Sequence, residues 1–308
     1  MKCLLIGGGG FIGHNISKRM EEKGYAVTVW DIASNSFESG SGINYCQVDY
    51  FSAELRAEQL EDQDYVILLA CSVSPQSSME YETGFYGKDV SRMIYLLDLI
   101  KKAGHPRLVF ISSGGTVYGN TEVFPITEDM PTNPINHYGI LKLTQEKIVL
   151  MYNELYGMKN IVLRLANPYG WGQKIASGVG AVTSFLECIM KGEKIKIYGD
   201  GNAIRDYILI SDVAEMVCRL LNRNVYDEKP IYNIGTEKGA KLNEIVHSVE
   251  ELVGKKADII YYPNRIYDVS KNVLCNRKIK RAIGEYECVP LQKGIELYYE
   301  QMCLKVGM

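Results

Sequence analysis

The sequence predicts an α/β protein, with a doubly wound parallel sheet and a smaller mixed α/β domain. Through the first half of the chain, short apolar runs alternate with longer amphipathic stretches, which is typical of βαβ units. A glycine-rich segment directly follows the first apolar run, as in Rossmann-type folds. After Asn167 the alternation ends and the pattern becomes mixed. These three observations carry the prediction of the fold class.

The strands and helices of the first half follow from hydrophobic periodicity. The apolar runs predict strands at Lys2–Gly7, Ala26–Asp31, Ile43–Val48, Asp64–Ala70, Arg107–Ser112 and Asn160–Leu165. The amphipathic stretches predict helices at Phe11–Lys23, Ala53–Leu60, Gly84–Ala103 and His137–Tyr156. Because the strands are almost continuously apolar, we expect helices on both faces of the sheet.

The second part of the chain begins with a loop that leaves the sheet, since proline and glycines crowd residues 168–180. Beyond it we predict helices near Val182–Lys191, Ser211–Asn222, Leu242–Val253 and Pro290–Leu304, with a strand at Lys194–Tyr198. The predicted division places residues 1–166 and roughly 206–234 in one domain. Residues 167–205 and 235–308 form the other domain.

Composition excludes several classes of protein. The 308 residues are 46% hydrophobic and 23% charged, with a net charge of −3, which fits a folded chain of one large or two moderate domains. No strongly basic surface for nucleic acid is expected. No apolar run reaches the length of a membrane span and no secretory signal opens the chain, so we expect a cytoplasmic protein without a membrane partner. The eight cysteines are scattered, which predicts neither a metal site nor a disulfide framework.

The glycine-rich segment has the features of a dinucleotide-binding turn. Gly7, Gly10 and Gly13 form G-x-x-G-x-x-G between the first predicted strand and helix. Glycines let a pyrophosphate approach the backbone, and the helix N-terminus attracts its charge. Asp31 ends the second predicted strand, where an acid accepts hydrogen bonds from a ribose and repels a 2′-phosphate, so NAD is favoured over NADP. Asp49, after the third strand, is a candidate contact for adenine or simply a turn residue.

A tyrosine–lysine pair is the candidate acid/base. In Y-x-x-x-K the phenol and the ammonium share one face of a helix, and the cation is expected to lower the pKa of the tyrosine towards neutrality. The motif occurs twice, at Tyr138/Lys142 and at Tyr267/Lys271, among 22 tyrosines. Tyr138 opens a predicted helix, 25 residues after Ser113, whereas Tyr267 lies in a loop-like region. We therefore predict that the first pair is the functional one.

These motifs together resemble the extended short-chain dehydrogenase/reductases, and among them the NAD-dependent nucleotide-sugar epimerases similar to UDP-glucose 4-epimerase. The resemblance rests on the glycine turn with Asp31, on residues 112–119 (SSGGTVYG), and on residues 138–142 (YGILK). It continues through residues 164–170 (RLANPYG), 197–201 (IYGDG), 205–208 (RDYI) and 211–214 (SDVA). The ordered set covers nearly the whole chain.

The resemblance implies an epimerase that inverts C4 of a nucleotide-linked hexose, a UDP-sugar, through a 4-keto intermediate. Tyr138 is implied as the acid/base and Lys142 as the residue that binds the nicotinamide ribose. The first domain would bind NAD and the second the nucleotide-sugar. The implied cofactor-binding residues are Gly7, Gly10, Phe11, Ile12, Gly13, Asp31, Asp49, Ala70, Ser112, Tyr138 and Lys142. A homodimer through the helices near Gly84–Ala103 and His137–Tyr156 is also implied.

One departure from the family concerns the hydroxyl that assists the tyrosine. The family has Ser or Thr where this chain has Gly114. Thr116 or Ser113 is the candidate replacement, and Thr116 is favoured because strand alternation puts it on the side of Gly114 if the chain stays extended. A packed β-branched residue is the alternative interpretation of Thr116.

The implied substrate-binding residues are Thr116, Asn167, Tyr198, Arg205, Arg265, Asp268 and Asn272. The two arginines suit a diphosphate, although a surface salt bridge is the plain alternative for each. Asn272 is expected to gate the size of the sugar's C2 substituent. A reductase or a dehydratase remains an alternative activity, with Asp31 against an NADP-dependent reductase and Gly115 and Thr116 against a dehydratase. A non-catalytic NAD-sensing or scaffold protein is the alternative from another class.

Overall fold

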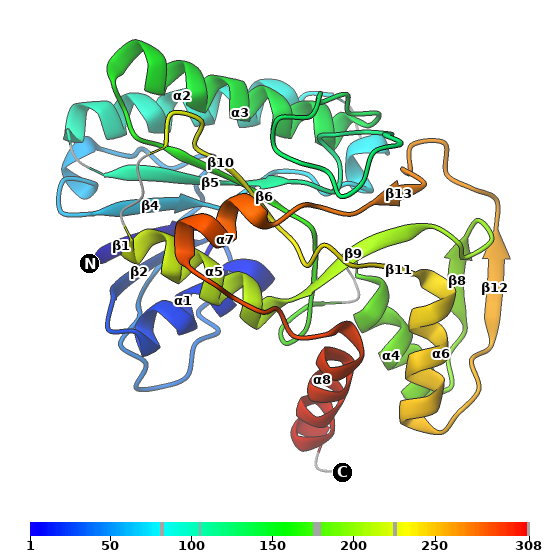
Figure 1. Ribbon diagram of the computed structural model, residues 1–308. Helices are drawn as coiled ribbons and strands as arrows, with labels where there is room; N and C mark the ends of the chain where they lie inside the picture. Colours follow the sequence, from blue (N-terminus) through cyan, green and yellow to red (C-terminus); the bar gives the residue numbers. More distant parts are fainter. Residues whose placement is uncertain (81–82, 105, 175–179, 224–226, 307–308) are drawn as a thin grey trace.

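The computed structural model describes residues 1–80, 83–104, 106–174, 180–223 and 227–306. A seven-stranded sheet forms its centre, with the strand order β10-β6-β5-β4-β1-β2-β3 (Figure 1). Every neighbouring pair in this sheet is parallel. The strands are β1 (Lys2–Ile6), β2 (Ala26–Asp31), β3 (Asn44–Gln47), β4 (Tyr65–Leu68), β5 (Arg107–Ser113), β6 (Ile161–Leu165) and β10 (Ile231–Ile234).

Helices cover both faces of this sheet (Figure 1). On one face lie α2 (Phe85–Ala103) and α3 (His137–Tyr156), over a core that includes Leu96, Phe110 and Val162. The other face carries α1 (Phe11–Glu22), α5 (Ile210–Asn222) and α7 (Arg277–Ile283). The continuously apolar strands are therefore buried on both sides, as the sequence predicts.

A charged cluster joins α1 to α5. The Glu215 carboxylate accepts hydrogen bonds from Arg19, Lys23 and Arg219. Burial opposes ionisation of this carboxyl group, but the hydrogen bonds from the three cations outweigh it and lower the pKa of Glu215 to about 2. The cluster therefore holds the two helices together on one face of the sheet.

The smaller part of the molecule is built on two short sheets. One has the order β11-β9-β13, and β7 also pairs with β9; the other pairs β12 with β8. Their strands are β7 (Asn167–Tyr169), β8 (Ile195–Tyr198), β9 (Ile204–Leu209), β11 (Gly239–Lys241), β12 (Ile259–Tyr262) and β13 (Lys271–Asn272). The accompanying helices are α4 (Ala181–Lys191), α6 (Leu242–Val253) and α8 (Leu291–Val306). None of the described helices is long and apolar enough to span a membrane.

One predicted helix is wrong. Residues 53–60 form only a short 3-10 turn at Ala57–Gln59. The physical reason lies in α2, because the Arg92 guanidinium donates to the carbonyl of Ala53 and the Tyr95 hydroxyl donates to that of Leu55. The segment is thus bound to α2 through its own carbonyl groups in a non-helical conformation.

The sequence analysis predicts β8 but not the other strands of the smaller sheets. Three of those, β7, β11 and β13, are only two or three residues long, too short to show a period. The longer strands β9 and β12, and β10 of the central sheet, were also not predicted. The predicted domain boundaries at residues 166, 206 and 234 stay a prediction. The structure adds that β9 begins at Ile204 in a small sheet and that α7 contacts α5 and β10.

Candidate active site

The turn between β1 and α1 forms a cradle for a pyrophosphate. Gly7 has φ +82°, and a Cβ there would lie 2.7 Å from the backbone nitrogen of Ala70. A Cβ at Gly13 would lie 2.5 Å from the Cα of Gly8. The backbone can therefore adopt this turn only with glycine, which also leaves the first N–H groups of α1 open to a phosphate. The predicted cofactor residues Gly7, Gly13 and Ala70 are brought together here.

The predicted ribose contact closes the same turn. Asp31 ends β2, and its Oδ2 accepts the backbone N–H of Gly9 at 2.9 Å while its Oδ1 accepts that of Ala33 at 3.0 Å. A carboxylate thus sits at the edge of the glycine turn, which fits the ribose hydroxyls of NAD and opposes a 2′-phosphate. Asp49 instead closes a turn after β3, where its oxygens accept the N–H of Phe51 and the hydroxyl of Ser52. Contact between Asp49 and adenine stays a prediction.

The Tyr138–Lys142 pair lies in the first turns of α3. Asn136 caps this helix by accepting the N–H of Gly139 at 2.8 Å. Gly139 lets the helix approach the strand-end turn after β5, since a Cβ there would lie 2.8 Å from the carbonyl oxygen of Thr116. The Lys142 ammonium lies 5.6 Å from the centre of the Tyr138 ring. It is almost fully buried and donates to the carbonyl of Ile111 at 3.0 Å.

The protonation of Tyr138 differs from the sequence-based expectation. Burial raises the pKa of the Tyr138 phenol, and the charges of Cys71 and Asp89 raise it further. The expected lowering towards neutrality by Lys142 is therefore not found in the protein alone, because loss of hydration disfavours the phenolate.

The second Y-x-x-x-K match has no helical geometry. Tyr267 lies in a turn and Lys271 begins β13, so the two side chains do not share a helix face. The structural context therefore agrees with the choice of Tyr138.

The premise that favoured Thr116 is wrong. Strand β5 ends at Ser113, and residues 114–116 form a turn in which the N–H of Thr116 donates back to the carbonyl of Ser113 at 3.2 Å. The chain is not extended here, so alternation does not apply. A Cβ at Gly114 would collide with Leu274 at 2.4 Å, so that position faces the core. A Cβ at Gly115 would instead lie within 4 Å of the Ser113 hydroxyl and of Asn167. Ser113 and Thr116 both stay candidates.

The predicted substrate residues lie mostly on or between the strands of the small sheets, with Asn167 on β7, Tyr198 on β8, Arg205 on β9, Asn272 on β13, and Arg265 and Asp268 between β12 and β13; Thr116 lies in the turn after β5. The Asn167 amide donates to the carbonyl of Asp206. The Arg205 guanidinium donates to backbone carbonyls of Ile204 and Ser270. Burial lowers the pKa of Arg205, while the charges of Tyr207 and Asp268 act in the opposite direction.

Asn272 departs from its predicted role. It has no exposed surface, and its amide donates to the carbonyl of Gly114 at 2.9 Å. A fully buried side chain cannot gate the C2 substituent of a sugar by direct contact. Its position instead ties β13 to the turn that follows β5.

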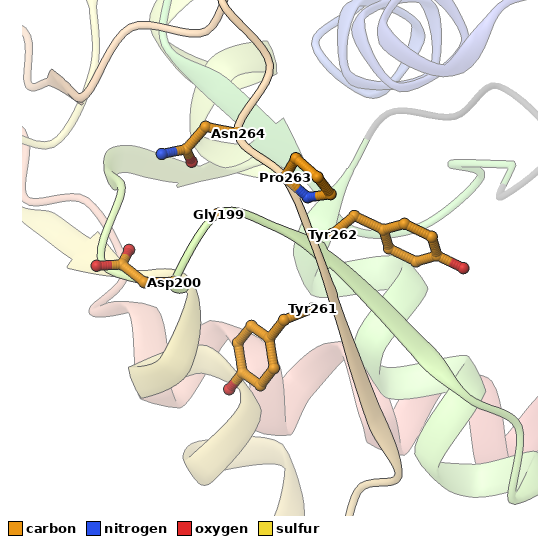
Figure 2. Close-up of a pocket in the computed structure, with 6 residues that line it drawn as sticks. All are labelled: Gly199, Asp200, Tyr261, Tyr262, Pro263 and Asn264. Carbon is orange, nitrogen blue, oxygen red and sulfur yellow. The ribbon is translucent and has the colours of Figure 1, made fainter.

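Tyr198 and Arg265 form a stacked group at the end of β8. The Arg265 guanidinium lies 3.5 Å from the centre of the Tyr198 ring. Tyr262 of β12 also stacks on Tyr198, with ring centres 5.4 Å apart. Tyr262 also lines a neighbouring open pocket of about 550 Å³ (Figure 2). That pocket is lined by Gly199, Asp200, Tyr261, Tyr262, Pro263 and Asn264.

A buried ion pair beneath the site was missed. Glu146 of α3 accepts three hydrogen bonds from Arg164 of β6, at 2.6–3.1 Å, and another from the Ser112 hydroxyl at 2.5 Å. Both partners are at most 3% exposed. The spacing contained a signal, because Glu146 follows Lys142 by four residues and so continues the face of Tyr138.

Among the described residues, no cluster of three or more histidine, cysteine or acidic side chains is arranged to hold a metal ion. The site is thus built from a glycine turn, an acid at the end of β2, a half-buried tyrosine and a buried lysine.

A parallel sheet with these groups at the carboxyl ends of its strands defines a dinucleotide-dependent enzyme of the short-chain dehydrogenase/reductase type. Residues 3–235 match the model of the NAD dependent epimerase/dehydratase family. The chain belongs to this family, and NAD is its cofactor.

Solved and characterised relatives cover almost the whole chain. A UDP-glucose 4-epimerase from Thermotoga maritima, solved with UDP-glucose, has a TM-score of 0.89 and 30% identity, over 99% of this chain and 100% of that one. The UDP-glucose 4-epimerase of Mycolicibacterium smegmatis is 29% identical, over 96% of each chain. The dTDP-4-dehydro-6-deoxyglucose reductase of Escherichia coli is 30% identical, over 95% of each chain. Relatives with nearly the same sequence identity to this chain, 29–30%, thus include both epimerases and a reductase.

Proposed function

We propose that this protein is an epimerase that inverts C4 of a UDP-linked hexose through a 4-keto intermediate. The observation that carries the proposal is the Tyr138–Lys142 pair, with a half-buried tyrosine and a buried lysine, on the helix that packs against the turn after β5. The similarity to UDP-glucose 4-epimerases over nearly the full chain supports it.

The chemistry assigned to the chain is a reversible proton transfer. Bound NAD supplies hydride acceptance and return at C4. The Tyr138 oxygen takes the proton of the C4 hydroxyl and returns it after the keto sugar has turned over. Tyr138 is a phenolate before it takes this proton and a phenol afterwards, and Lys142 is the buried cation that favours the phenolate form. Ser113 or Thr116 donates a hydrogen bond to the reacting oxygen, since both lie in the adjoining turn.

The nucleotide end of the substrate is assigned to the small sheets. Arg205 and Arg265 are proposed to bind the diphosphate, as guanidinium groups bind phosphate oxygens in a bidentate manner. Tyr198, already stacked under Arg265, offers an aromatic face with a polar tip. Asn167 and Asp268 are proposed to contact the sugar-nucleotide between these groups.

The test is a coupled assay on the purified protein without added cofactor. We expect bound NAD in the preparation and interconversion of UDP-glucose with UDP-galactose, or of their N-acetyl forms. Tyr138→Phe should lower kcat by at least about 100-fold. Tyr156→Phe, a half-exposed tyrosine on the same helix, is the matched control and should retain activity. A requirement for stoichiometric NADPH would instead establish a reductase, and NAD binding without turnover on a panel of UDP-, dTDP- and GDP-sugars would establish a sensor or scaffold.

We also propose a homodimer through α2 and α3. These helices expose apolar side chains at Ile94, Ile140, Met151 and Leu155, and the last three fall within one stripe of α3 by helical spacing. Burial of such a stripe against a second copy favours association. Leu155→Glu should convert the dimer to monomer in analytical ultracentrifugation, and a wild-type protein that sediments as a monomer contradicts the proposal.

A further inference from the structure

An asparagine on the cofactor helix joins two parts of the molecule that lie far apart in the chain. Asn15 is in the second turn of α1 and is half-buried. Its side-chain amide donates to the carbonyl of Phe11 at 2.8 Å, within the helix, and to the carbonyl of Trp171 at 2.9 Å. The second bond crosses 156 positions of the sequence. Asn15 therefore links the helix of the glycine cradle to the segment that follows β7.

The segment that Asn15 reaches, residues 170–173, packs on the first residue of α1. Gly172 has φ +86°, and a Cβ there would lie 3.8 Å from Nδ2 of Asn15 and 3.9 Å from Cδ2 of Phe11. Phe11 begins α1 and is one of the residues implied in cofactor binding. The first N–H groups of the same helix suit a phosphate. Residues 170–173 therefore flank the turn of α1 that is assigned to the cofactor.

The other side of this segment is fastened to the smaller part of the molecule. The Thr183 hydroxyl of α4 donates to the side-chain oxygen of Gln173, and the Gln173 amide donates to the carbonyl of Pro168. Trp171 packs against the apolar core around α4 and α6. Because α1 lies on the large sheet and α4 in the smaller part (Figure 1), residues 170–173 connect the two.

The segment also continues directly from a strand with a proposed substrate residue. β7 begins at Asn167, whose amide donates to the carbonyl of Asp206 on β9 at 3.1 Å, and it ends at Tyr169. Because β7 and residues 170–173 are consecutive in the chain, the bond from Asn15 also fixes where β7 lies relative to α1. One side chain thus connects the cofactor helix with the strand assigned to the sugar-nucleotide.

We propose that Asn15 is a positioning residue that holds residues 170–173 beside the cofactor cradle and thereby slows the release of NAD. The bond from Asn15 to Trp171 must break before the segment moves away from the first turn of α1, so the bond adds to the barrier for release. The inference goes beyond the proposed function, because it concerns NAD, the cofactor of the whole family, and not the reaction of the sugar. An enzyme that regenerates its NAD in every cycle has no need to release it, so retention also suits the proposed epimerase.

The dissociation rate of a bound dinucleotide tests this inference in the full-length protein. NADH is the probe, because the fluorescence of bound NADH is lost when an excess of NAD displaces it. Asn15→Leu removes both donated hydrogen bonds with little change in side-chain volume, and leucine is the better helix former, so α1 itself is not weakened. We expect NADH to dissociate about 3–10-fold faster from this variant. The association rate constant should change less than the dissociation rate.

A matched variant controls for a general loss of stability. The Asn153 amide of α3 donates to the carbonyl of Asn160 at 2.9 Å, which is a similar bond between a helix and a loop. Asn153→Leu removes this bond and should leave the NADH dissociation rate unchanged, because the glycine cradle and residues 170–173 are not involved. If Asn15→Leu does not fold, Asn15→Ala is measured in its place.

An unchanged NADH dissociation rate in the folded Leu or Ala variant of Asn15 overturns the inference. An equal acceleration in Asn153→Leu also overturns it, because the effect would then follow stability and not the bond to Trp171. Because the displacement of NADH needs no turnover, it separates this inference from the proposed epimerase activity. A protein without epimerase activity that still releases NADH faster in Asn15→Leu refutes only the proposed function.

Discussion

The ion pair between Glu146 and Arg164 offers a quantitative test of how α3 is held. Glu146→Gln replaces a carboxylate that accepts three hydrogen bonds from the guanidinium, and the new amide N–H₂ faces guanidinium N–H groups. Burial disfavours the charged guanidinium, yet the bonds to Glu146 outweigh it and raise the pKa of Arg164. The variant therefore leaves a buried cation that stays ionised without a counter-charge. Breaking such a pair costs about 3–5 kcal/mol.

This cost corresponds to a measurable change in melting temperature. With roughly 2.1 cal/mol/K of unfolding entropy per residue, the 308 residues contribute about 0.65 kcal/mol/K. A loss of about 4 kcal/mol then lowers Tm by about 6 °C. Circular dichroism during thermal unfolding is the assay. Glu187→Gln is the matched control, because Glu187 pairs with the exposed Lys191 on α4 at 2.9 Å and should cost less than about 0.5 kcal/mol. Equal Tm values for the Glu146 variant and the control would refute the reasoning.

Three further predictions concern the cofactor cradle and the α1–α5 contact. Gly13→Ala should lower Tm and abolish NAD binding, since its Cβ would lie 2.5 Å from a backbone Cα. The control Gly87→Ala, in open space on α2, should instead stabilise the protein by about 0.5–1 kcal/mol. A Gly13→Ala variant with unchanged Tm and NAD binding would contradict the turn argument. Asp31→Asn should weaken the affinity for NAD roughly 10-fold and reduce the preference for NAD over NADP. Calorimetry with both dinucleotides measures the two affinities, and an unaltered preference counts against the role of Asp31. The folded-state pKa of Glu215 lies below its ordinary value of 4.5, so its stabilisation is present above pH 4.5 and is lost as pH falls towards about 2. Glu215→Gln should lower the free energy of unfolding by about 1–2 kcal/mol at pH 7 and leave it unchanged near pH 2 in urea titrations; equal losses at both pH values would contradict this.

Much of the fold was readable from the sequence because its signals are local. A turn that needs glycine can be read from the chain itself, as at Gly7 and Gly13, and so can helical periodicity. The helices predicted at His137–Tyr156 and Leu242–Val253 are confirmed with the same bounds. The strand predicted at Ala26–Asp31 is likewise confirmed. Each element has enough residues to show its period and a cap or turn to mark its end.

The candidate site was readable in its parts but not in its arrangement. The order of motifs isolates Tyr138 and Lys142, and the end of β2 isolates Asp31. The Gly114-Gly115 pair is compatible with a turn, but glycine permits extended and turned backbone alike, so the sequence did not decide that residues 114–116 turn back on Ser113. The choice between Thr116 and Ser113 therefore could not rest on alternation.

The sequence by itself determined six strands of the central sheet, the dinucleotide turn and the identity of the acid/base candidate, since these depend on residues close together in the chain. The seventh strand, β10, was not predicted. Only the tertiary structure decided what surrounds that candidate. Asn272 meets the carbonyl of Gly114 across 158 positions, and Asp89 meets Ser72 across 17. Burial and charge around Tyr138 come from such distant partners. Periodicity shows which face of an element is buried, but not which side chain of another element packs against that face.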